Sequence, residues 1–550
     1  MRYHRSPGGC AIRGSTIVFA VRQSLAQRSL GRPVRSLLFL AGGAALAWKV
    51  SQAILNNEPE TLIWLPLMAV GAAFVFVVMQ DWRKGLYCFL FWLAFEDFFR
   101  KYLGNSIVMF FGKDLLLVLV YLSFYSQVRR GQAKFFRPPF LVPLLLLVWL
   151  GVAQIFNFAS PSVLYGLLGF KVYFFYFPLF FIGYSLIDSE AQLQRLLKFV
   201  LCLVLVIVSL GIAQSIVGPT FLNPATLAAE IRESSTLYRV APESGAVLYR
   251  PCSVFVSTGR YSNFLMVTWL LVLGTTGYLL LRTRHGRRLA FLSAILVAAG
   301  SFLIGARGTL VWAFINAAVT SVAFLWGAPW KQREVIRIFR TLTRVAAGMA
   351  FALVLLYLFF PTAIGSRMAF YSETLFPSIG EGELRTRTWE YPIRNLVGAF
   401  DDRWPYGYGI GTGSLGAQYV VKYFGVKRLG MSVESGFGSL VLEMGIGGLI
   451  LWVLAASAIV ISAWRVVKRL RGSPWFPLGF AIFWYSFILL FPAMFSGLQP
   501  YQDYLLNAYL WLLLGILFRL PSLAQSIQSN EGQTGLRSSA DPGALHQAPH

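Results

Sequence analysis

The sequence predicts an all-α polytopic membrane protein with about 14 transmembrane helices (12–14) and two long extracytoplasmic loops. Hydrophobic residues make up 57% of the 550 residues and charged residues only 13%, with a mean hydropathy of +0.62. Soluble domains carry roughly 25% charged residues. Apolar runs of about 20 residues, the length that crosses a bilayer as a helix, recur along most of the chain.

The predicted spans follow from these runs taken in order. The third and ninth of them are short. The fourteen spans are 36–55, 61–79, 85–99, 106–126, 139–156, 163–187, 199–217, 262–281, 289–304, 309–327, 345–363, 436–462, 475–495 and 502–519.

The distribution of Lys and Arg predicts the orientation. With a cytoplasmic N-terminus, the inside segments hold 30 of these residues and the short outside loops hold 3. The positive-inside rule therefore places both termini in the cytoplasm. The net charge of +25 follows from this topology, so it does not indicate nucleic acid as a partner.

The two ends of the chain differ in composition from the spans. Residues 1–35 form a basic tail that fits either an amphipathic interfacial helix or a disordered segment. Residues 521–550 are polar and predict a disordered cytoplasmic tail. Residues 36–520 then form one transmembrane domain, whose long outer loops are 218–261 and 364–435.

The second long loop contains "GIGTGSLG", in which Gly411, Gly413 and Gly416 have the spacing of a dinucleotide-binding turn. That motif requires a preceding strand and a following helix within a βαβ unit. Here "DDRWPYGY" precedes it on the predicted outer side, so we interpret it as a tight turn that permits close backbone approach.

The same loop carries an amphipathic segment, "GELRTRTWEYPIRNLVGAF". Its spacing predicts a helix with Arg387 and Arg394 on one side, either facing the loop interior or forming a solvated basic face. The apolar stripe on the other side comprises Trp389, Ile393, Leu396, Val397 and Phe400.

Arginine recurs on the predicted outer side, against the positive-inside bias. Guanidinium binds phosphate in a bidentate manner, so this recurrence indicates an anionic substrate, with some arginines in structural pairs with acidic residues. The outer arginines are Arg232, Arg239, Arg250, Arg260, Arg307, Arg367, Arg385, Arg387, Arg394 and Arg403.

Charged residues inside the spans are few. Glu96 and Asp97 on one span and Lys113 and Asp114 on the next predict ion pairs across a hairpin, with a proton relay as the alternative. The outer side lacks clusters of His, Cys or acidic residues with ligand spacing, so we expect neither a metal nor a cofactor.

Several segments between about residue 85 and 450 together resemble the O-antigen ligase and polysaccharide polymerase family. They are "FEDFFRKYL" with "GKDLLLVLVYL", "LLGFKVYFFYFPLFFIG", "YRPCSVFVSTGRYSNFL", "GARGTLVWAF", "RTRTW" with "WPYGYGIGTGS", and "VESGFGSLVLEMGIGGL". The resemblance implies a multi-pass glycosyltransferase of lipopolysaccharide or exopolysaccharide biosynthesis in the bacterial inner membrane, which we expect to be metal-independent. Such an enzyme moves glycan from a polyprenyl diphosphate carrier to a glycan, lipid or protein acceptor, with other export components as candidate partners.

The resemblance also implies roles for individual residues. Arg250, Arg307 and Arg387 stand where the family has arginines. We expect Arg250, Arg307 and Arg394 to bind the diphosphate and Arg387 to act with Glu434 in catalysis. Many family members have a His-Asn pair where this chain has Glu434 and Ser435.

No histidine replaces that pair, because all four lie in predicted cytoplasmic segments. Glu434 is then a candidate general base, with a role in capping the next helix as the alternative. The sequence does not distinguish ligation of glycan to an acceptor from polymerisation of repeat units. A flippase or other polysaccharide transporter is the alternative function, although we find no internal repeat of the kind that many transporters have.

Overall fold

The computed structural model divides into a unit of residues 1–81 and a larger unit of residues 82–550. In the smaller unit a helix covers Gly71–Gln80. Apart from residue 48, the predicted span 36–55 lies outside the described residues, as do residues 61–70 of the predicted span 61–79. The described residues are 48, 71–104, 107–224, 237–282, 285–330, parts of 340–355, 357–376, 385–403, 405–414, 417–426, 435–497 and 499–539.

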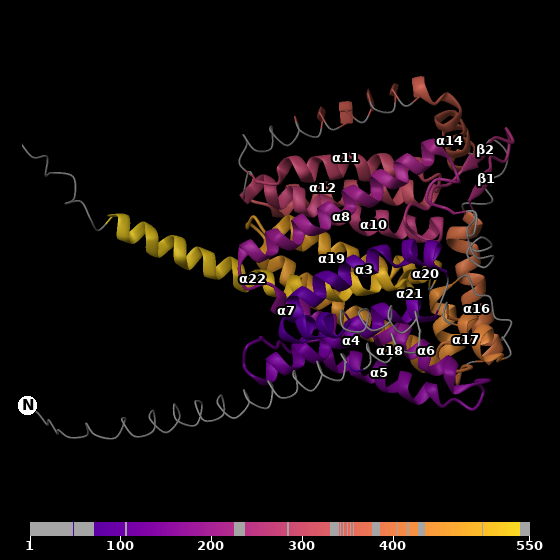
Figure 1. Cartoon of the computed structure of the whole chain (residues 1–550), viewed down its shortest axis with the longest axis horizontal. Coiled ribbons are helices and arrows are strands. Elements are labelled where there is room, and N and C mark those ends of the chain that lie inside the picture. The colour runs from indigo at the N-terminus through magenta and orange to yellow at the C-terminus, as the bar shows by residue number, and fades with distance from the viewer. Residues whose placement is uncertain are drawn as a thin grey trace, which may run out of the picture. The chain divides into compact units, whose positions relative to one another are not determined.

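The larger unit is built from helices that follow the predicted spans (Figure 1). The first helices are α3 (Trp82–Leu103), α4 (Ile107–Arg129), α5 (Leu141–Ile155), α6 (Val163–Phe174), α7 (Leu179–Leu186) and α8 (Glu190–Val217). The next are α10 (Thr258–Arg282), α11 (Arg287–Leu303), α12 (Arg307–Gly327) and α14 (Pro361–Leu375). The last are α18 (Gly436–Leu470), α19 (Phe476–Leu490), α20 (Pro492–Ser496), α21 (Gln499–Gln502) and α22 (Tyr504–Ser539).

These helices make the chain an all-α polytopic membrane protein. Within the described residues, eight helices are long and apolar enough to cross a membrane. The predicted number of about 14 is not confirmed. Two of the remaining predicted spans correspond to shorter helices, α5 with 15 residues and α11 with 17. The predicted span 345–363 is described only in part.

The C-terminal helix is longer than the sequence predicts. We expected a disordered tail from residue 521, but α22 continues to Ser539 and includes Pro521. Side chains beyond residue 525 lie outside the described residues. The apolar half of α22 is almost wholly buried, which fixes the helix before the polar residues begin.

The two long loops lie along the same end of the larger unit, on the right in Figure 1. The first loop contains strands β1 (Tyr238–Val240) and β2 (Val247–Tyr249), which pair antiparallel with Tyr238 opposite Tyr249. The amide of Ala241 donates to the carbonyl of Ala246 at 2.9 Å and closes the turn. Leu248 of β2 packs against Phe370 and Tyr371 of α14.

The second loop contains η1 (Thr386–Glu390), a π-helical turn, followed by α16 (Tyr391–Arg403) and α17 (Ala417–Phe424). The amphipathic helix is thus present, but its apolar stripe divides. Leu396 and Phe400 pack against α18. Trp389, Ile393 and Val397 are exposed, so this row of side chains is available to lipid.

Candidate functional site

The segment that joins β2 to α10 is held in place by buried side chains of α3 and α8. The Asp97 carboxylate accepts the amide of Val256 at 3.2 Å. Lys101 donates to the carbonyl of Ser253 at 2.9 Å, and Gln214 accepts the amides of Cys252 and Ser253 at 2.8 and 2.7 Å. These contacts fix the backbone that carries Arg250, which directly precedes them in the chain.

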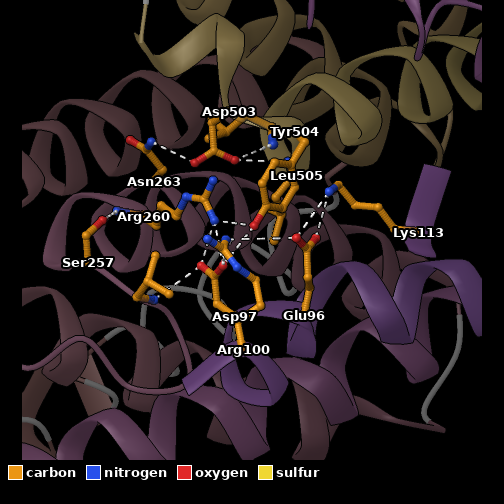
Figure 2. A network of polar contacts seen from close by, with 12 residues as sticks. Glu96, Asp97, Arg100, Lys113, Ser257, Arg260, Asn263, Asp503, Tyr504 and Leu505 are labelled. Carbon is orange, nitrogen blue, oxygen red and sulfur yellow. Dashed lines mark hydrogen bonds and ion pairs between the residues drawn. The ribbon is translucent and has the colours of Figure 1, made fainter. Parts of the chain in front are cut away.

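Figure 2 shows the ion pairs beneath this segment. Arg260 donates to both oxygens of Asp97 at 2.7 Å and lies over the ring of Tyr504, and Arg100 also pairs with Asp97 at 3.0 Å. Lys113 pairs with Glu96 at 3.0 Å. The predicted pairing across the hairpin is therefore confirmed for Glu96.

Asp97 and Asp114 do not form the predicted ion pairs across the hairpin of α3 and α4. Asp97 pairs with arginines instead, and Asp114 pairs with Lys171 of α6. Arg260 is consequently a structural arginine, because its charge is balanced inside the protein.

Arg367 of α14 joins three separate parts of the fold. Its Nε donates to the carbonyl of Leu303 at 2.7 Å, and its Nη2 donates to the carbonyl of Tyr249 at 3.0 Å. Only 1% of the side chain is exposed. The hydroxyl of Tyr371, one turn later, donates to the carbonyl of Phe302 at 2.7 Å. Arg367 and Tyr371 therefore attach α14 to the hairpin and to the end of α11.

Arg250 lies beside the turn that follows α11. It is 8% exposed, and a Cβ added at Gly305 would overlap the side chain of Leu248, 2.5 Å away, and would lie 3.4 Å from the Cγ of Arg250. Gly305 has φ +65°, so glycine is favoured there for both its conformation and its space. The turn "GARG" consequently provides room for the Leu248 side chain of β2, with Arg250 in contact beside it.

The surroundings disfavour the positive charge of both buried arginines. Burial lowers the pKa of Arg250 to about 10, and Arg239 lowers it further while Tyr371 opposes the shift. Burial likewise lowers the pKa of Arg367 to about 10. A desolvated guanidinium regains stability when an anion lies beside it, so a bound anion would counter both shifts.

Arg307 completes what we call the arginine cluster, defined as Arg250, Arg307 and Arg367. It is half-buried at the first position of α12, two residues after Gly305. The N-cap residue Ala306 makes no side-chain capping bond, so the partial positive charge of the helix N-terminus adds to the guanidinium. The arrangement is suited to an anion with more than one phosphate oxygen.

The other predicted site residues are placed less completely. Arg394 is exposed on α16. Arg387 lies in η1, and its side chain is outside the described residues, as is the whole of Glu434. The N-cap of α18 is Ser435, whose hydroxyl accepts the amide of Gly438 at 3.2 Å. Ser435 is thus the N-cap residue of α18, and the alternative role of Glu434 at the start of this helix concerns a residue outside the described part of the chain.

The glycine-rich turn surrounds a buried carboxylate of the protein itself. Glu443 of α18 accepts the amide of Gly411 at 3.1 Å and the amide of Gly413 at 2.9 Å. Its carbonyl accepts the amide of Gly409 at 3.0 Å. Successive amides of this kind bind anions, and here they bind Glu443. The interpretation as a tight turn is thus confirmed, and Gly416 lies outside the described residues.

Close backbone contact explains the glycines. A Cβ at Gly411 would overlap the carbonyl of Tyr165, and one at Gly445 would overlap the carbonyl of Pro405. Gly445 has φ +70° and interrupts the helical geometry of α18. The kink lets the amide of Ile446 donate to Pro405 at 3.2 Å, which fixes the loop on α18.

Arg367 is one of the predicted outer arginines, but neither Arg367 nor Glu443 is among the predicted site residues. The segment around Arg367 carries no motif, so nothing in the sequence distinguishes it from the other outer arginines. Glu443 had a usable signal, because a charge within a glycine-rich apolar helix needs a polar partner and the glycine-rich turn offers one.

Comparison with family models and with curated proteins finds no match to this chain.

Proposed function

We propose that this protein is a membrane glycosyltransferase that transfers or polymerises glycan from a polyprenyl diphosphate carrier at the outer face of the cytoplasmic membrane. The observation that carries the proposal is the arginine cluster. Arg250 and Arg367 are almost fully buried, Arg250 beside Gly305 and Arg367 on the carbonyl of Leu303 two residues earlier, and Arg307 follows the Gly305 turn. Both long loops contribute to this end of the molecule, which the charge distribution predicts to be extracytoplasmic.

In the proposed reaction an acceptor hydroxyl attacks the anomeric carbon of the donor sugar. The new carbon–oxygen bond forms as the bond between that carbon and the diphosphate breaks, and the diphosphate leaves with the electron pair. The hydroxyl proton passes to the carboxylate of Glu434. The arginine cluster binds the diphosphate and stabilises the charge that develops on it, Arg394 of α16 also binds it, and Arg387 of η1 acts with Glu434 in catalysis.

The position of Glu434 supports its proposed part. It directly precedes Ser435, which caps α18, so its carboxylate is not needed for that cap. In the sequence Glu434 stands at the junction of the second long loop and α18, where a carboxylate can accept the proton of an acceptor hydroxyl.

The test supplies detergent-solubilised protein with lipid-linked glycan, with and without candidate acceptors, and measures released polyprenyl diphosphate. We expect turnover without any ion gradient. Arg250→Gln should lower it by roughly 10²–10³-fold, as for loss of one donor to a developing anion. Arg239→Gln, an exposed arginine of the same hairpin, is the matched control and should change turnover less than about threefold.

The same experiment addresses the alternative of a transporter. Movement of lipid-linked glycan across liposomes, with its covalent structure unchanged and no release of diphosphate, would contradict the proposal and favour a flippase. Longer glycans formed without added acceptor would identify a polymerase, and modified acceptor would identify a ligase.

A further inference from the structure

A second group of arginines lines a cavity at the opposite end of α18. The cavity has a volume of about 740 Å³ and lies between the last turns of α18, the residues before α5 and the middle of α22. From the kink at Gly445 to Leu470 the helix has 25 residues, enough at about 1.5 Å per residue to cross a bilayer. The cavity is therefore at the membrane face away from the glycine-rich turn.

The lining combines a basic rim with an apolar wall. Arg465, Arg469 and Arg471 are exposed at the rim, and the apolar part includes Phe136 and Phe518. Arg471 stacks on Trp326 at 4.1 Å. No acidic residue belongs to the described lining. The volume is that of a small-molecule site.

The nearby acidic charge is already balanced. Asp188 pairs with Arg83 at 3.0 Å, with Lys134 at 3.2 Å and with Arg519 at 3.3 Å. Among the described residues, neither Arg465 nor Arg469 makes an ion pair. The rim therefore has an excess of positive charge that the described part of the chain does not neutralise.

An apolar stripe of α18 leads into the cavity. The exposed side chains Ile450, Leu454 and Ile461 recur at helical spacing, and Arg465 and Arg469 continue the same row. An exposed apolar stripe on a membrane-spanning helix contacts acyl chains. The row of side chains thus passes from the acyl region to a basic rim at headgroup level.

We infer that this cavity binds the headgroup of an anionic phospholipid of the leaflet at that end, with the acyl chains along the exposed stripe of α18. Basic pockets between transmembrane helices on the cytoplasmic side bind such headgroups. The helix dipole and the positive-inside rule are enough to explain arginines at this end of α18. They do not explain why these arginines line a cavity, or why the exposed apolar stripe of α18 leads into that cavity.

The test uses the full chain and is independent of the proposed transferase activity. Purified protein is titrated with phosphatidylglycerol and, separately, with phosphatidylcholine, and bound lipid is counted by native mass spectrometry. Each arginine beside an anionic headgroup contributes about fivefold in affinity, so Arg465→Gln with Arg469→Gln should weaken phosphatidylglycerol binding roughly 30-fold. The matched control is Arg129→Gln with Arg130→Gln, two exposed arginines outside the cavity lining, which should alter binding less than about threefold.

Three results would overturn the inference. The first is equal phosphatidylglycerol binding by both double variants. The second is equal affinity of the unmodified protein for phosphatidylcholine and phosphatidylglycerol. The third is displacement of bound phosphatidylglycerol by inorganic phosphate, which would identify a soluble anion as the ligand. Should the cavity variant not purify, a photoreactive phosphatidylglycerol is applied to the unmodified protein. Labelling must then fall on residues 462–473 or 518–525, and labelling elsewhere would refute the site.

Discussion

Replacing the carboxylate of Glu443 by an amide should release the glycine-rich turn from α18. In the structure two backbone amides donate to this carboxylate, from Gly411 at 3.1 Å and from Gly413 at 2.9 Å. Glutamine offers one acceptor oxygen, and its amino group faces the second donor, so Glu443→Gln loses one of the two bonds. A hydrogen bond to a buried charged group contributes about 1.5–3 kcal/mol.

The expected loss of about 2 kcal/mol corresponds to a roughly 30-fold increase in the open population of the turn. Hydrogen exchange measured by mass spectrometry on a peptide covering residues 405–416 reports this population directly. The amides of Gly411 and Gly413 should exchange about 30-fold faster in Glu443→Gln, while the β1–β2 hairpin keeps its exchange rates.

The chain offers a matched control for this variant. The half-buried Glu373 also accepts two backbone amides, from Glu243 at 2.7 Å and from Ser244 at 3.1 Å. Glu373→Gln should leave residues 405–416 unchanged. Unaltered exchange at Gly411 and Gly413 in Glu443→Gln would refute the reasoning, and so would equal acceleration in both variants.

The remaining predictions concern topology, catalysis and packing. Reporter fusions after residues 240 and 410 should be extracytoplasmic and a fusion after 285 cytoplasmic; the reverse at 410 would contradict the proposed side of the site. Glu434→Gln should lower turnover roughly 10²–10⁴-fold in the lipid-linked glycan assay, and near-normal turnover would exclude it as the base. Turnover should survive EDTA, whereas loss restored by magnesium would contradict diphosphate binding by arginine alone. Gly445→Ala should destabilise the protein by at least about 1–2 kcal/mol in thermal unfolding, because its positive φ and the Pro405 carbonyl both oppose a Cβ; an unchanged midpoint would argue against the kink.

The sequence alone was sufficient to locate most membrane helices. The predicted spans 199–217, 262–281 and 309–327 lie within α8, α10 and α12. A membrane-spanning helix needs apolar side chains along its whole length. The hydropathy that predicts it is therefore contained in about 20 consecutive residues. Short helices such as α5 were located too, although hydropathy does not say whether they cross the membrane.

The roles of the charged residues depend on partners far away in the chain. Arg260 and Asp97 are separated by 163 positions, and the pair becomes evident only when α3 and α10 are packed together. Sequence patterns likewise gave no reason to select Arg367 over the other outer arginines. Its environment is formed by Leu303 and Tyr249, which belong to two other elements.

The glycine-rich turn depends both on its local sequence and on the tertiary structure. Its sequence context excluded a dinucleotide site and predicted close backbone approach, because local residues determine whether a strand precedes the glycines. The identity of the group that the turn approaches was decided by tertiary structure, which brings Glu443 to amides 30 residues earlier in the chain. Hydropathy and backbone preference depend on residues close together in the chain, so the sequence alone predicts them. Charge pairing and hydrogen bonding across the bundle depend on which helices pack together, so only the tertiary structure determines them.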